Sequence, residues 1–160
     1  MDLILLLPLL FIAHDGEEIL TQRRWMDRNS GHIVSRFPHA KRMVSLMSGG
    51  STGRFSLMVA EELAIILAGT WLYVEGCPMP LVCLFYGYGL HLVVHVVQFA
   101  AMRGYVPGIV TAVAELPFVA YLATDIAAGY SVTENALLAL VGIVFAGVNV
   151  VLVHWLFEGK

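Results

Sequence analysis

Charged residues are scarce in this chain of 160 residues. Asp, Glu, Lys and Arg make up 13% of it, whereas 59% of the residues are hydrophobic. Soluble domains carry about 25% charged residues, so this composition excludes an ordinary soluble domain. The mean hydropathy of +0.80 instead predicts an integral membrane protein. The net charge of −3 is less informative than the positions of the charges.

Cysteine is rare as well, and the two that occur, Cys77 and Cys83, cannot make a disulfide framework. We expect Cys77 in a turn and Cys83 just inside the helix that follows. A bridge between them would constrain only one short turn, so cysteine usage says nothing about the redox compartment.

A basic leader region is also missing. The chain begins with Met1 and Asp2, and the apolar run that follows contains His14, Glu17 and Glu18. A secretory signal peptide has a positively charged start and an uninterrupted apolar region. We therefore expect this run to be a retained first membrane span.

Long apolar stretches, in contrast, are abundant. A helix needs about 20 apolar residues to cross about 30 Å of hydrocarbon, and five stretches come close to or exceed that length. They are about Leu3–Thr21, Phe55–Glu75, Met79–Ala101, Val106–Thr124 and Val132–Phe157. The sequence therefore predicts an all-α polytopic membrane protein, with residues 1–160 forming a single domain of five transmembrane helices.

Basic residues are concentrated in one connection, residues 22–54. It holds seven of the nine Lys and Arg residues: Arg23, Arg24, Arg28, Arg36, Lys41, Arg42 and Arg54. With five spans, the remaining two, Arg103 and Lys160, fall on the same side of the bilayer. Because short cytoplasmic loops are enriched in basic residues, we expect a protein of the cell membrane with its N-terminus outside and its C-terminus inside. Within this basic cytoplasmic loop, Pro38–Met47 suits a short surface helix.

The first span carries an unusual group of ionisable residues. A helix turns about 100° per residue, so His14, Glu17 and Glu18 share one arc about 100° wide. An unpaired ionisable group inside a bilayer costs a few kcal/mol or more. Three of them on one face exceed what packing needs, so this face is predicted to meet a ligand, an ion or a partner residue.

Polar residues in the other spans are predicted to lie at a similar depth, about 6–16 Å from the cytoplasmic end. They are Glu61 and Glu62, His91 and His95, Glu115, and Asn149 and His154. One shared cavity that opens toward the cytoplasm explains this common depth. Glu61 and Glu62 are adjacent and thus about 100° apart on a helix, so we expect one of the two to face it.

Two histidines spaced i, i+4, such as His91 and His95, can present both imidazoles to one metal ion. We predict that His14, Glu17, Glu18, His91 and His95 bind a divalent transition metal. Imidazole with carboxylate suits zinc or iron. A free glutamate, Glu62 or Glu115, would then act as general base in metal-activated hydrolysis or in oxidation by iron. The depth of the site suggests membrane lipid as partner and a lipid-like or small-molecule substrate; no nucleic acid is expected.

Plainer interpretations remain open beside this one. A buried histidine or glutamate can simply hydrogen-bond to a neighbouring helix. For Glu115, such a hydrogen bond and a role in the site are equally good interpretations. Asn149 and His154 are interpreted as packing or interface groups. The whole protein could instead be a proton- or cation-coupled transporter that uses the same acids as a relay. It could also be a metal-free binding or assembly subunit. The absence of an inverted repeat counts against an ordinary transporter.

The segment His14-Asp15-Gly16-Glu17-Glu18 resembles the motif that names the HXXEE family, small integral membrane proteins of unknown function. The pair His91 and His95 and the segment Arg103–Gly108 are also similar to later blocks of that family. The resemblance covers most of the chain. It implies a multi-span membrane protein, and it adds positions to the argument but no reaction.

Overall fold

The computed structural model describes residues 2–158, without the side chains of residues 46–49, 154, 157 and 158. His154, one of the polar residues considered above, lies outside the described side chains. The elements are η1 (Leu3–Leu6), α1 (Leu7–Arg36), η2 (Pro38–Ala40), α2 (Lys41–Gly49), α3 (Thr52–Val74), α4 (Met79–Met102), α5 (Ile109–Ala128) and α6 (Val132–Glu158). The prediction of an all-α fold is confirmed.

Four helices among the described residues are long and apolar enough to cross a membrane: α3, α4, α5 and residues Val132–Val153 of α6. The α1 helix does not reach the same hydropathy, because Asp15, Glu17 and Glu18 lie within four consecutive positions. Length and composition thus support four of the five predicted spans, and they are consistent with a protein of the membrane.

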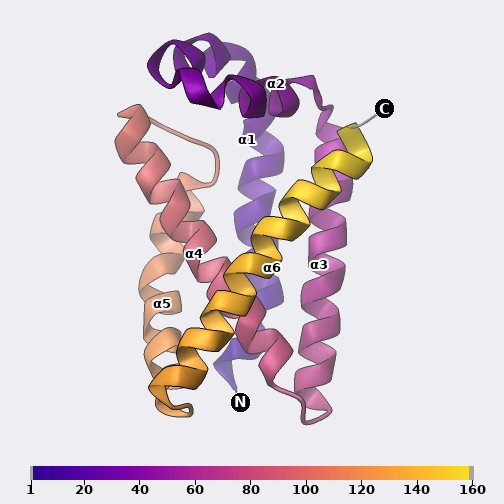
Figure 1. The fold of residues 1–160 in the computed structure, drawn as a ribbon, viewed down its shortest axis with the longest axis vertical. Helices are drawn as coiled ribbons and strands as arrows, with labels where there is room; N and C mark the ends of the chain where they lie inside the picture. Colours follow the sequence, from indigo (N-terminus) through magenta and orange to yellow (C-terminus); the bar gives the residue numbers. More distant parts are fainter. Residues whose placement is uncertain (1, 159–160) are drawn as a thin grey trace.

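The α4 helix is the centre of the bundle and packs against α1, α3, α5 and α6. Figure 1 shows α6 crossing in front of α4, with α3 and α5 on opposite sides. Small residues make the crossing of α4 and α6 close. Gly142 lies against the backbone of Cys83, and Gly87 lies against the carbonyl of Gly142 and the methyl group of Ala146. Small residues permit such close approach of apolar helices.

The α1 helix is longer than the sequence suggested, because it runs through residues 22–36 of the predicted connection. After Pro8 in its first turn the helix contains no proline, and the next one is Pro38; the residue before a proline is disfavoured in the helical region. Phe37 accordingly leaves it, with φ −128° and ψ 77°. The rest of the connection forms η2 and α2, close to the predicted surface helix, and lies across one end of the bundle (Figure 1).

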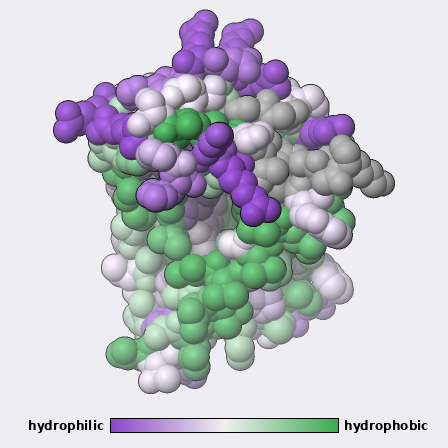
Figure 2. Space-filling model, turned by 45° about the horizontal axis from the view of Figure 1, so that its top comes forward, coloured by the Kyte–Doolittle hydropathy of each residue, from purple (hydrophilic) through white to green (hydrophobic). Residues whose placement is uncertain are grey.

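The surface divides into a hydrophilic end and apolar sides. Figure 2 shows hydrophilic residues gathered over the end that carries α2, with hydrophobic residues below them. The α6 helix illustrates the apolar sides, since Leu140, Val148 and Val151 are each more than half exposed. Apolar side chains exposed along a whole helix suit a lipid environment.

Candidate metal centre

Three ionisable side chains of α1 are buried in the helix bundle. His14 is fully buried, Asp15 is 4% exposed and Glu18 is 9% exposed. On α4, His95 is 4% exposed, and His91 is partly buried one turn before it. These side chains come from two helices that are packed against each other, so residues far apart in the sequence share one site.

Four of them form a compact group of possible metal ligands: His14, Glu18, His91 and His95. One nitrogen or oxygen atom of each lies within 4.8 Å of the corresponding atoms of the other three. The Nε2 atom of His95 lies 3.2 Å from Oε1 of Glu18 and 3.1 Å from Nε2 of His91. The ring of His14 stands edge-on to both α4 histidines, with centroids 5.0 and 4.7 Å away.

These separations suit a transition metal. Zinc binds imidazole and carboxylate at about 2.0–2.2 Å in a tetrahedron, which places neighbouring ligand atoms about 3.4 Å apart. The separations of 3.1 and 3.2 Å around Nε2 of His95 are close to that value. Small movements of the other side chains would complete the arrangement, so the group could hold a metal ion.

Unpartnered polar atoms distinguish this group from ordinary buried side chains. In the described part of the chain, Nε2 of His14, Nδ1 of His95 and Oδ2 of Asp15 are buried without a hydrogen-bond partner. Most buried polar side-chain atoms have one. The unpartnered Nε2 of His14 therefore indicates a place where a ligand would supply the missing interaction, whereas Nδ1 of His95 lies on the side of Gly108.

Thr111 on α5 sets the direction of the His14 ring. Its hydroxyl lies 2.9 Å from Nδ1 of His14 and donates to Oε2 of Glu17 at 2.7 Å. A hydroxyl has one proton, so when it donates to Glu17 it accepts from Nδ1–H of His14. The Nε2 atom of His14 then keeps its lone pair for a ligand, which is how metal-binding histidines are usually oriented.

Glu17, which the sequence analysis placed among the ligands, lies apart from this group. Its carboxylate accepts hydrogen bonds at the start of α5, from the backbone N–H of Thr111 at 2.8 Å and of Val110 at 3.4 Å. The hydroxyl of Tyr105 donates to it as well, at 2.9 Å. Partial burial and this hydrogen bond raise the pKa of Tyr105, so its hydroxyl stays protonated. Glu17 thus ties α1 to α5 through the residue that orients His14.

Gly108 closes the site from the loop before α5. It has φ +77°, and a Cβ atom there would lie 2.9 Å from Cε1 of both His14 and His95. Only glycine combines this backbone conformation with such a close approach. Gly108 was not predicted as a site residue; the sequence feature that could have indicated it is the Pro107–Gly108 dipeptide in front of an apolar span, which predicts a turn.

The two glutamates predicted as general bases occupy different places. Glu115 accepts a hydrogen bond of 2.5 Å from the hydroxyl of Tyr88, whose ring stands edge-on to that of His14. Of the two adjacent glutamates of α3, Glu62 is the one whose charge acts on Glu18 and Asp15. Its neighbour Glu61 accepts a hydrogen bond from Asn149 of α6 at 3.1 Å. Glu62 is therefore the member of the pair that acts on the buried acids of α1.

Asp15 is the buried residue that the sequence analysis missed. Its spacing could have revealed it, because Asp15 and Glu18 are three residues apart and share a helix face. Its electrostatic neighbours are Glu18, Glu62 and Glu115. Acids from three helices therefore meet beside the histidines.

The fold and the site together define a class: an all-helical protein of membrane type, with three histidines and a glutamate gathered among its helices. The sequence matches the model of a family described as "Protein of unknown function with HXXEE motif" over residues 5–122, so the chain belongs to this family. The resemblance noted from the motif is thus confirmed. No curated protein and no solved structure matches the chain.

Proposed function

We propose that this protein is a metal-dependent membrane enzyme whose metal ion is bound by His14, Glu18, His91 and His95. One observation carries the proposal: four potential ligand atoms lie within 4.8 Å of one another, and Nε2 of His14 is buried without another partner. Three imidazoles and one carboxylate favour zinc or iron over magnesium or calcium, which prefer oxygen ligands. Glu17 supports the site through Thr111 instead of binding the ion.

The bound metal would activate water at neutral pH and polarise an ester or phosphoryl oxygen. Glu62, next to Glu18, is suited to take the proton from that water as general base. Glu115 holds Tyr88 against His14 and thereby helps to position a ligand. Hydrolysis of a lipid-like substrate follows from a site among apolar helices, and iron in the same ligands would support oxidation instead.

Metal content tests this proposal directly. Protein purified without chelator or affinity tag is expected to contain about one equivalent of zinc or iron by elemental analysis. Dialysis against a chelator should remove the metal, and re-addition should restore it. Protein that neither retains nor takes up a stoichiometric ion would favour the metal-free alternative, in which these groups only hold the helices together.

We further propose that α1 is the fifth membrane span, with the N-terminus outside and α2 in the cytoplasm. The reason is that seven of the nine basic residues lie between residues 22 and 54, and cytoplasmic loops are enriched in basic residues. Although α1 carries charged residues, those that face the bundle need not meet lipid. Reporter fusions inserted at Gly50 and after Lys160 are both expected to read cytoplasmic. An external signal from either fusion would contradict this orientation.

A proton or cation relay is the second candidate, and the buried acids favour it. Asp15 has an unpartnered oxygen and lies beside Glu18, Glu62 and Glu115. Chains of such residues between helices carry protons in pumps and transporters. The two functions differ in their readout: an enzyme shows metal-dependent turnover in detergent, whereas a relay shows ion flux in sealed liposomes.

A further inference from the structure

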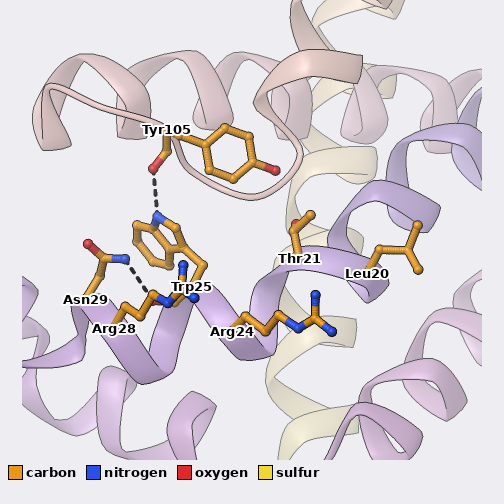
Figure 3. Close-up of a pocket in the computed structure, with 7 residues that line it drawn as sticks. All are labelled: Leu20, Thr21, Arg24, Trp25, Arg28, Asn29 and Tyr105. Atoms are coloured by element: carbon orange, nitrogen blue, oxygen red, sulfur yellow. Dashed lines mark hydrogen bonds between the residues drawn. The ribbon is translucent and has the colours of Figure 1, made fainter.

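A second polar site lies where α1 leaves the apolar part of the bundle. A pocket of about 250 Å³ opens between α1 and the loop that leads into α5. Figure 3 shows Thr21, Arg24, Trp25 and Arg28 on α1, with Tyr105 facing them from the loop. Pockets for drug-sized ligands measure about 300–1,000 Å³, so this one suits a head group better than a whole lipid.

The pocket carries two positive charges that nothing in the described chain neutralises. Arg24 and Arg28 are one helical turn apart, and neither forms an ion pair with a described acid. Arg23 makes such a pair with Asp27, at 3.2 Å. Exposed guanidinium groups at this spacing can bind the oxygens of a phosphate in pairs.

The wall of the pocket is fixed by hydrogen bonds. The indole Nε1 of Trp25 donates to the carbonyl of Tyr105 at 2.7 Å, which joins the loop to α1. Asn29 donates to the carbonyl of Trp25 at 2.8 Å. The aromatic side of the pocket is therefore held in place without a ligand.

We propose that this pocket binds the phosphate group of an amphiphilic substrate or product. Leu20, which lines the pocket, is 78% exposed and provides apolar surface one turn before Arg24, next to the apolar part of α1. A phosphate between Arg24 and Arg28 would thus leave an attached acyl chain running along Leu20. The proposal deepens the proposed enzymatic function by naming its substrate class, and for catalysis it rests on that function.

A hydrogen-bonded path links this pocket to the histidines. The hydroxyl of Tyr105 donates to Glu17, which accepts from Thr111, which in turn contacts His14. A ligand that contacts Tyr105 would therefore press on the loop that contains Gly108, the residue against His14 and His95. The pocket and the histidine group are in this way two ends of one site.

Binding can be measured independently of turnover. The full chain in phosphatidylcholine nanodiscs would be titrated calorimetrically with dihexanoyl phosphatidic acid, with dihexanoyl phosphatidylcholine and with inorganic phosphate. The double variant Arg24→Gln, Arg28→Gln is expected to bind the phosphatidic acid at least tenfold more weakly, because charge-assisted hydrogen bonds are lost. Its metal content should equal that of the wild type, which separates this proposal from the metal proposal.

The matched control is Arg36→Gln, Lys41→Gln, which removes the same charge from the same end outside the pocket. This control is expected to keep its affinity within twofold. Equal losses in both variants, no loss in either, or equal affinity for phosphatidylcholine would overturn the pocket assignment. If inorganic phosphate binds as tightly as the lipid, and only the pocket variant loses it, the site takes a soluble phosphate compound. Wild-type protein that takes up no metal but binds the phosphatidic acid in the pocket would overturn only the enzymatic proposal.

Discussion

The double substitution His91→Ala, His95→Ala is expected to lower the affinity for zinc at least a hundredfold. Loss of a residue that merely supports a metal ligand costs about 10–100-fold, and this variant removes two of four direct ligands. The remaining pair, His14 and Glu18, would hold the ion by only two bonds. Equilibrium dialysis with elemental analysis measures the effect.

Membrane insertion should be unaffected, because alanine is tolerated in an apolar span. The control for packing is Val93→Ala, Val97→Ala, which makes two truncations at the same spacing on the same helix. These valines are 42% and 60% exposed, on the side of α4 away from the histidines, so metal affinity should stay within twofold. Metal retained by the histidine variant would refute the assignment of these ligands.

Gly108→Ala is expected to have the second largest effect, a loss of metal affinity of tenfold or more with a lower melting temperature. The added methyl group would meet both His14 and His95 at 2.9 Å, and it would place a side chain at a positive φ, which costs about 1 kcal/mol. The rings must move apart or the loop must shift. Either response spoils ligand geometry that a metal holds within about 0.2 Å.

Substitutions at two other glycines separate the effect of the steric contact with the histidines from the effect of the positive φ. Gly76 has φ +89° but nothing within 4 Å of its Cβ position, and Gly104 has neither a positive φ nor a close neighbour. Gly76→Ala should lower stability by the backbone cost alone without affecting metal binding, and Gly104→Ala should change neither. If Gly108→Ala merely matched Gly76→Ala, contact with the histidines would not be important for the site.

The sequence predicted the meeting of α1 and α4 correctly because helical spacing alone determines which residues share a face. His91 and His95 are four residues apart, as are His14 and Glu18, so each pair had to point in one direction. Their common depth then placed both pairs at the same level. That the two pairs come together also requires α1 to pack against α4, as it does in the structure.

The role of Glu17 could not be predicted in the same way. Glu17 and Glu18 lie about 100° apart on α1, so they face different neighbours: Glu17 meets the start of α5 and Glu18 meets α4. The order of helices around α1 depends on tertiary packing, which spacing within one helix does not reveal. The continuation of α1 to Arg36 was missed for another reason, since hydropathy marks where apolar character ends and not where a helix ends.

The contact between Gly142 and the backbone of Cys83 limits the rotation of α4, the helix that carries His91 and His95. A helix that is clamped against a neighbour at one point cannot rotate about its own axis at another. Ligand atoms lie roughly 6 Å from the axis, so a 20° rotation of α4 would displace an imidazole by about 2 Å. The glycines at this crossing therefore fix the direction of the His91 and His95 side chains. They do so from one to three helical turns away, without contacting either histidine.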